Sequence, residues 1–174
     1  MPTPTVPLRT LAQALAWWAV SRWVQRAFPG VPTLTTQQLA EWLSQGRAPF
    51  PILLDVRGDD EFAVSHLPEA HRVASLEAAL ALGLDRGQPI VAYCSVGYRS
   101  ARLVNQLQGL GYTEVYNLAG SIFKWANEGR SLVSQSQPEP QVHPYNAIWG
   151  VLLKPGLASP LARDGEQSRD DSVL

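Results

Sequence analysis

The 174-residue sequence has a single cysteine, Cys94, three scattered histidines and no excess of positive charge. One cysteine excludes an intrachain disulfide framework, an internal Cys-x-x-Cys redox pair and a zinc site built from several thiolates. With so few ligands we expect no metal and no cofactor. The formal net charge of −1 argues against a protein that binds nucleic acid through its phosphates.

Charge and tryptophan are unevenly distributed along a chain that has enough apolar residues to bury a core. The sequence is 45% hydrophobic and 17% charged, which is typical of a folded protein. Residues 1–30 contain three arginines, no acidic residue and three of the six tryptophans, whereas residues 31–153 have 8 basic and 11 acidic residues. The first 30 residues are therefore a compositionally separate segment.

The segment from residue 8 to residue 28 lacks glycine and proline and is predicted to form a helix that Pro29-Gly30 ends. Residues 14–20 are all apolar, but such a run falls far short of the roughly 20 residues that span a bilayer. We favour docking of this helix on the chain's own domain. Contact with a membrane surface or with a partner helix are the alternatives. Without a convincing signal-peptide cleavage site, we expect a cytoplasmic protein, membrane-peripheral under the second interpretation.

Short apolar runs alternate with amphipathic segments between residues 31 and 133. This alternation predicts an α/β fold, with a small central parallel sheet and helices on both of its faces. Strands are predicted at 52–54, 70–74, 89–93 and 114–118, and helices at 35–46, 59–64, 75–82, 100–110 and 122–128.

The chain outside this α/β domain consists of two flanking parts. The predicted organisation is an N-terminal helix in residues 1–30, the domain in 31–133, a Ser/Gln/Pro-rich linker in 134–144 and a C-terminal apolar stretch with a polar tail in 145–174. The apolar stretches at 14–20 and 145–153 are each too short to be stable alone. We expect them to pack on each other or on the outer helices of the domain.

Cys94 stands between a buried strand and a helix, where α/β folds place their chemistry. Gly97 allows the N–H groups of the following loop to converge, the next helix adds its positive end, and Arg99 can close over an anion. These groups would lower the pKa of the Cys94 thiol below its usual value of about 8.5. The alternative is a buried structural cysteine, which position and the five following residues disfavour.

Several ordered sequence blocks resemble one known family. They are Leu53-Leu54-Asp55-Val56-Arg57, Glu61-Phe62, Ser65-His66-Leu67-Pro68-Glu69-Ala70, residues 90–100, residues 107–112, and Leu118-Ala119-Gly120 with Trp125 and Gly129. Residues from about 33 to 133 thereby resemble a rhodanese domain. Ser65, Glu69 and Ser121 stand where glycine is common in that family. We expect these three positions to lie in turns away from the Cys94 loop.

The resemblance implies a sulfurtransferase that works in two steps. Cys94 would take the outer sulfur of a small anionic donor such as thiosulfate, and a thiol, cyanide or a protein acceptor would remove it from the resulting persulfide. The loop N–H groups would stabilise the persulfide anion and Arg99 would attract the donor. The expected binding loop is Ser95, Val96, Gly97, Tyr98, Arg99 and Ser100.

Two other functions remain open. Related phosphatases and arsenate reductases have five residues between cysteine and arginine, whereas only four separate Cys94 from Arg99. The smaller loop favours a persulfide over a phosphoryl group. A non-catalytic protein-interaction module is the stronger alternative, but it would leave Cys94 and Arg99 without a role.

Other residues near these motifs have weaker predicted roles. Asp55 and Arg57 could orient the Cys94 loop, although satisfying backbone groups at a strand end is the favoured role. His66 is predicted to be structural, and Arg102 is expected at the solvated surface. Tyr98 is the residue that we expect to contact sulfur acceptors.

Overall fold

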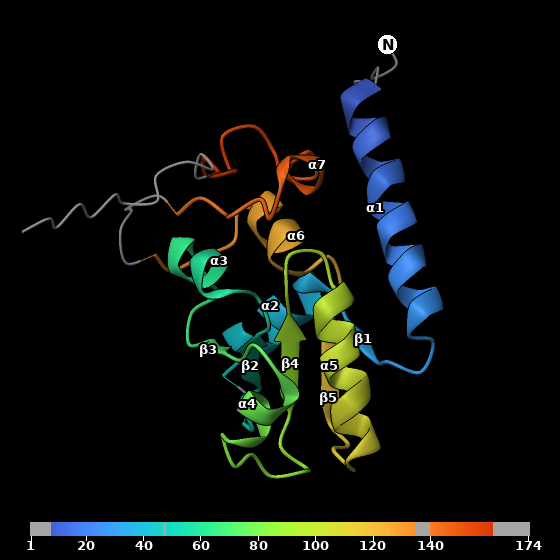
Figure 1. Ribbon diagram of the computed structural model, residues 1–174, viewed down its shortest axis with the longest axis vertical. Helices are drawn as coiled ribbons and strands as arrows, with labels where there is room; N and C mark the ends of the chain where they lie inside the picture. Colours follow the sequence, from blue (N-terminus) through green and yellow to red (C-terminus); the bar gives the residue numbers. More distant parts are fainter. Residues whose placement is uncertain (1–7, 47, 135–139, 162–174) are drawn as a thin grey trace, which may run out of the picture.

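The computed structural model describes residues 8–46, 48–134 and 140–161. Its elements follow the predicted alternation (Figure 1). In chain order they are α1 (Leu8–Ala27), β1 (Thr33–Leu34), α2 (Thr36–Ser44), β2 (Ile52–Asp55), α3 (Asp59–Val64), β3 (His71–Arg72), α4 (Leu76–Leu80), β4 (Ile90–Tyr93), α5 (Tyr98–Gly109), β5 (Val115–Leu118), α6 (Ser121–Asn127) and α7 (Ala147–Gly150).

Five strands form a parallel sheet in the order β1-β5-β4-β2-β3. The central strand β4 pairs with β2 and β5 and is fully buried. Its carboxyl end leads directly into Cys94. The cysteine is therefore placed at the middle of the sheet edge where parallel strands end.

Alternation along β4 divides the core between the two faces of the sheet. Val91 and Tyr93 pack in a cluster that includes buried side chains of α2 and α6. Ile90, Ala92 and Cys94 belong to a second cluster with α4 and α5. Helices thus cover both faces, which confirms the predicted α/β architecture.

Several elements differ in extent from the sequence predictions, and strand β1 was not predicted. Helix α5 begins at Tyr98 rather than at residue 100, because Gly97 takes φ +112° and serves as its N-cap. Tyr98 and Arg99 therefore lie in the first helical turn instead of the loop. The two residues of β1 are too short to show a periodic pattern. Strand β3 is an edge strand of only two residues.

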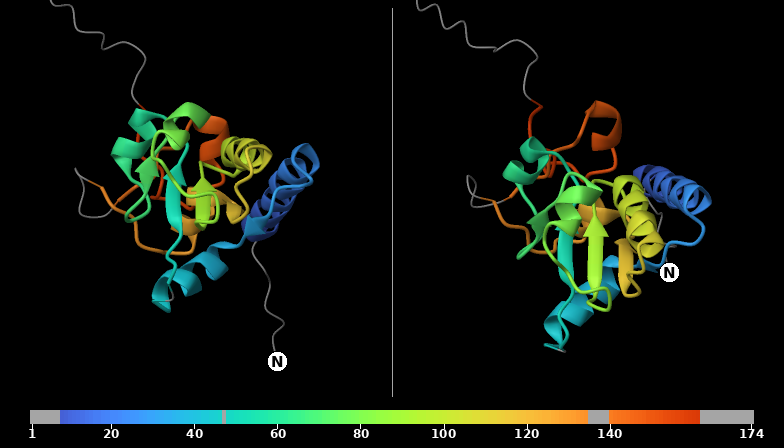
Figure 2. Two further views of the ribbon diagram at one scale, coloured as in Figure 1. Left: turned by 90° about the horizontal axis from the view of Figure 1, so that it is seen from below. Right: turned by 60° about the horizontal axis from the view of Figure 1, so that its bottom comes forward.

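Helix α1 packs on the chain's own domain through one face. Val24 is buried, while Trp17 and Val20 pack on the core cluster beneath α2 and α6. The opposite face is exposed, with Leu15 at 67% and Trp18 at 66%. The C-terminal end of the helix lies beside the start of α5, where Trp23 stacks on Tyr98 (Figure 1 and Figure 2). Within the described residues, no helix is both long and apolar enough to cross a membrane.

The C-terminal segment also packs on the domain and contacts α1. Leu152 and Leu153 are buried in the core cluster, and Val142, which composition assigns to the linker, is fully buried there too. The Leu152 carbonyl accepts hydrogen bonds from the side chains of Gln13 in α1 and Asn127 in α6. The two apolar stretches outside the domain thus meet each other as well as the domain.

Candidate active site

The Cys94 side chain is nearly inaccessible and its sulfur is held in the loop that follows β4. It is 1% exposed, and the Gly97 N–H donates a hydrogen bond to Sγ at 3.1 Å. Burial opposes ionisation, but the charge of Arg99 and the N–H groups of Ser100 and Gly97 outweigh it. The pKa of the Cys94 thiol is therefore lowered, which increases the fraction of thiolate at neutral pH.

Asn117 at the end of β5 braces the loop from the side. Its Nδ2 donates to the Gly97 carbonyl at 3.1 Å, and its Oδ1 accepts from the Ser100 hydroxyl at 2.7 Å. A Cβ at Gly97 would lie 3.5 Å from Asn117 Nδ2, so the strained φ rather than space requires glycine here. Sequence analysis missed Asn117, because a polar residue at a strand end has no distinctive spacing.

The start of α6 supports the loop from behind. The N–H groups of Ile122 and Phe123 donate to the carbonyls of Cys94 and Ser95, at 3.1 and 3.2 Å. The Ser121 hydroxyl accepts a hydrogen bond from the Cys94 N–H at 3.1 Å. The prediction that Ser121 lies away from the loop is therefore wrong. The register of β4 against β5 places the start of α6 next to Cys94.

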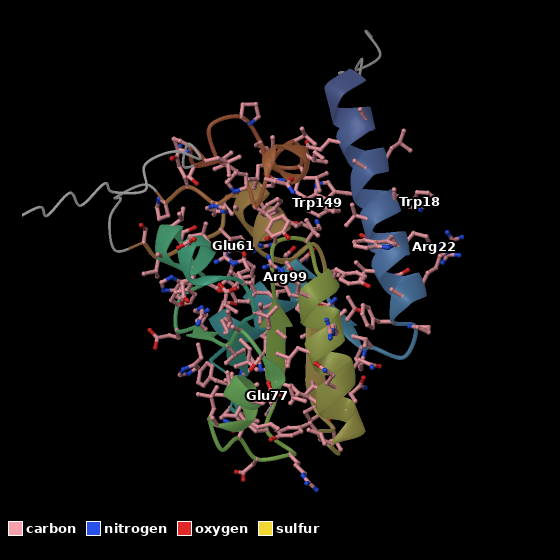
Figure 3. The ribbon with its side chains drawn as sticks, in the orientation of Figure 1. Trp18, Arg22, Glu61, Glu77, Arg99 and Trp149 are labelled. Carbon is pink, nitrogen blue, oxygen red and sulfur yellow. The ribbon has the colours of Figure 1, made fainter. Side chains whose placement is uncertain are left out.

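Glu61 in α3 ties the loop to the opposite side of the site. It accepts two hydrogen bonds from Arg99, at 2.7 and 2.8 Å, and one from the Ser95 hydroxyl at 2.9 Å. Glu61 and Arg99 lie close together in Figure 3. Burial opposes ionisation of Glu61, but hydrogen bonds from Arg99, Gly58 and Ser95 lower its pKa to about 2.

Sequence analysis used Glu61 only as part of a family motif and assigned it no place in the site. One local feature of the sequence could have indicated that Glu61 points inward. Glu61 is the third residue of an Asp-Asp-Glu run, and at the third position of α3 its carboxylate also accepts from the Gly58 N–H at 3.0 Å. That position turns Glu61 inward, with 5% exposed, while Asp59 and Asp60 are exposed. Its ion pair with Arg99 could not be read from the sequence.

We expect the Glu61 carboxylate to make folding pH-dependent. Its pKa is depressed from 4.5 to about 2, so its contribution to stability is present above pH 4.5 and is lost as the pH falls towards 2. Glu61→Gln should lower the free energy of unfolding by about 2 kcal/mol at pH 7 and flatten its decline below pH 5. Urea unfolding across this pH range measures both, with the exposed Glu69→Gln as control. An unchanged acid profile in Glu61→Gln would contradict the assignment.

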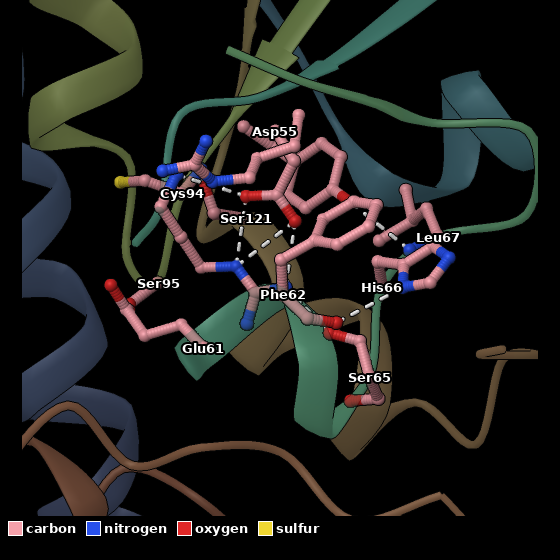
Figure 4. A network of polar contacts seen from close by, with 12 residues as sticks. Asp55, Glu61, Phe62, Ser65, His66, Leu67, Cys94, Ser95 and Ser121 are labelled. Carbon is pink, nitrogen blue, oxygen red and sulfur yellow. Dashed lines mark hydrogen bonds and ion pairs between the residues drawn. The ribbon is translucent and has the colours of Figure 1, made fainter. Parts of the chain in front are cut away.

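Asp55 and Arg57 form a buried ion pair beside the site rather than in it (Figure 4). Both side chains are 0% exposed, and Arg57 donates to Asp55 and to the Ser65 carbonyl. The described contacts of the pair include none with the Cys94 loop. This arrangement supports the strand-end role over direct orientation of the loop.

Three further residues considered in the sequence analysis, His66, Arg102 and Tyr98, have different surroundings. The His66 ring stacks on Phe62 and its Nδ1 bonds to the Phe62 carbonyl. Arg102 is exposed and lines, with Arg99, a hollow of about 290 Å³ that does not include Cys94. Tyr98 stacks on Trp23 of α1 at 4.3 Å. Among the described residues, no group of three His, Cys, Asp or Glu side chains is placed to hold a metal.

Comparison with known proteins identifies the architecture. A family model described as a rhodanese-like domain matches residues 35–128, more than half of the chain. The chain belongs to the rhodanese-like family. A structural neighbour of this fold is the polysulfide-sulfur transferase of Wolinella succinogenes, with a TM-score of 0.55, 24% identity, and coverage of 70% of this chain and 91% of that one. The rhodanese fold predicted from the motifs is confirmed.

Curated relatives of this rhodanese-like chain include sulfurtransferases. The human thiosulfate:glutathione sulfurtransferase is 28% identical over 111 residues, covering 55% of this chain and 94% of that protein. The probable adenylyltransferase/sulfurtransferase MoeZ of Mycobacterium tuberculosis is 32% identical over 101 residues, which span 55% of this chain but only 25% of MoeZ. The likeness to MoeZ thus covers a quarter of that protein's length. The parts of this chain outside residues 35–128 lie beyond the family match.

Proposed function

We propose that the protein is a sulfurtransferase in which Cys94 carries the sulfur. The observation that supports it most directly is the buried Cys94 sulfur that accepts the Gly97 N–H at 3.1 Å and has a lowered pKa. A thiolate in such a setting is a nucleophile, and the same N–H donors stabilise a terminal sulfur anion. Membership of the rhodanese-like family and the sulfurtransferase relatives agree with this function.

The first step transfers sulfur from an anionic donor such as thiosulfate. The Cys94 thiolate attacks the outer sulfur, a new S–S bond forms on Cys94, and the donor's S–S bond breaks with its electron pair leaving on sulfite. Arg99, half-buried beside the loop, attracts the donor, although Glu61 balances part of its charge. In the second step, a nucleophilic acceptor attacks the outer sulfur of the persulfide and restores the Cys94 thiolate.

The loop supplies hydrogen-bond donors for a sulfur anion, but the sequence supplies no second thiol to accept the sulfur. The Gly97 N–H donates to the Cys94 sulfur and the Ser100 N–H also lowers its pKa, while the carbonyls of Cys94 and Ser95 accept hydrogen bonds from α6. No second cysteine in the sequence can resolve the persulfide as a disulfide. The acceptor must therefore come from outside the chain.

Mass spectrometry after exposure to thiosulfate tests the function. We expect wild-type protein to gain one sulfur atom on Cys94, to lose it on addition of cyanide or a thiol, and Cys94→Ser to gain none. Hydrolysis of an aryl phosphate without sulfur loading would instead indicate a phosphatase. A protein that neither loads sulfur nor alkylates at Cys94 would be an interaction module.

A further inference from the structure

Cys94 lines a small hollow to which segments outside the rhodanese-like domain contribute part of the wall. The hollow has a volume of about 150 Å³. Its aromatic side chains are Trp23 of α1, Tyr98 of α5, and Tyr145 and Trp149 of the C-terminal segment. We refer to these four residues as the aromatic wall. Three of the four lie beyond residues 35–128, so this surface is a feature of this chain rather than of the matched domain.

The aromatic wall is packed by contacts between its members. Trp23 stacks on Tyr98 at 4.3 Å with an interplanar angle of 11°, and on Trp149 at 6.2 Å with an angle of 21°. Trp149 belongs to α7, and in Figure 3 it lies on the side of α7 nearer α1. Trp23 is nevertheless 45% exposed and Tyr145 is 51% exposed. Both therefore retain ring surface that a bound molecule could cover.

Glu61 balances part of the positive charge in the hollow. Among the described residues that line it, Arg99 is the one basic side chain, and Glu61 accepts two hydrogen bonds from its guanidinium. The Tyr145 ring lies over the same guanidinium, with 5.0 Å from Cζ to the ring centroid. Because Glu61 and the sulfur anion on Cys94 share the charge of Arg99, an acceptor with a charged body gains less in this position than an apolar ring, which leaves water and stacks.

We propose, building on the sulfurtransferase function above, that the acceptor is a small thiol with an aromatic or similarly apolar body, which the aromatic wall binds. A cavity of about 150 Å³ lined by apolar side chains is large enough for a benzene ring. The acceptor thiolate attacks the outer sulfur of the Cys94 persulfide. One S–S bond forms to the acceptor, the bond to Cys94 Sγ breaks, and the electron pair returns to the Cys94 thiolate.

Two thiols that differ only beyond the ethylene group test this specificity. Sulfur-loaded protein is mixed with 2-phenylethanethiol or with 2-mercaptoethanol, and mass spectrometry follows the loss of the extra sulfur. The ratio of the two rate constants is compared between wild type, Trp23→Ala and Tyr145→Ala, so that the intrinsic reactivities of the thiols cancel. We expect wild type to favour the phenyl compound and the ratio to fall about tenfold, equivalent to about 1.4 kcal/mol, in both variants.

Trp18→Ala is the matched control, because Trp18 lies on the same helix but points away from the domain (Figure 3). Its ratio should equal that of wild type. Circular dichroism establishes that each variant is folded, and the exposed Tyr145 provides a second test should Trp23→Ala unfold. An equal ratio in wild type and both wall variants overturns the proposal.

A measurement without sulfur transfer separates failure of the acceptor proposal from failure of the function. 2-Phenylethanol lacks a thiol, so it can occupy the hollow without reacting. We expect it to slow alkylation of Cys94 in wild type and Trp18→Ala but not in Trp23→Ala. If no sulfur loads on wild type, the sulfurtransferase function falls, and the acceptor proposal falls with it, whether or not 2-phenylethanol protects Cys94. If sulfur loads but neither ratio nor protection depends on the wall, only the acceptor proposal falls.

Discussion

Replacing Arg99 with glutamine is expected to raise the pKa of the Cys94 thiol and to slow its alkylation at neutral pH severalfold. Burial alone would raise this pKa, and the charge of Arg99 is the largest influence that lowers it. Without that charge, the thiolate forms only at higher pH. The midpoint of the alkylation rate against pH, measured with iodoacetamide, should therefore move upward.

Arg102→Gln is the control for Arg99→Gln. Arg102 lies on the same helix and is exposed, and the hollow that it lines does not include Cys94. Its loss removes the same formal charge without removing the neighbour of the thiol. If the alkylation rate of wild type and of Arg99→Gln has the same pH midpoint, the loop N–H groups alone activate Cys94. Sulfur loading from thiosulfate should also slow in Arg99→Gln, because the donor loses its cationic partner.

Asp55→Ala is expected to lower the free energy of unfolding by about 3–5 kcal/mol. Asp55 and Arg57 are both 0% exposed, and Arg57 Nη1 has no hydrogen-bond partner among the described residues even in the intact pair. Removing Asp55 leaves a guanidinium buried with the Ser65 carbonyl as its main remaining partner. Since a domain is typically stable by only about 5–15 kcal/mol, this loss should be plain in urea unfolding.

The double variant Asp55→Leu with Arg57→Met shows whether the loss of stability comes from an unpaired buried charge or from the lost hydrogen bonds. If the penalty of Asp55→Ala arises from an unpaired guanidinium, removing both charges should restore most of the stability. The double variant also decides the matter if Asp55→Ala does not fold. A double variant no more stable than Asp55→Ala would show that the hydrogen bonds to Ser65 and within the pair matter more than the charge.

Local patterns were sufficient to predict the α/β domain because its signals repeat. Fully apolar runs such as Ile90–Tyr93 mark strands covered on both faces, and glycines such as Gly111 end the helices between them. Boundaries shifted where a special backbone conformation intervened. Gly97 at φ +112° starts α5 two residues early, which moves Arg99 from the loop into a helix where Glu61 can reach it.

The residues that hold the Cys94 loop could not be predicted in the same way. Glu61, Asn117 and Ser121 come from α3, β5 and α6, and each bonds to the loop across 17 to 38 positions of sequence. A carboxylate, an amide and a hydroxyl are common residues without distinctive spacing. Their role depends on the order of the strands, which brings three elements to one end of β4.

The solitary Cys94 was determined by the sequence alone, together with its place after a buried strand and four residues before Arg99. These facts exclude an internal resolving thiol and require any sulfur on Cys94 to leave to an external acceptor. Only the tertiary structure decided what surrounds the thiol. Hydrophobic burial brings α1 and the C-terminal segment onto the domain, and their packing places Trp23, Tyr145 and Trp149 around Cys94.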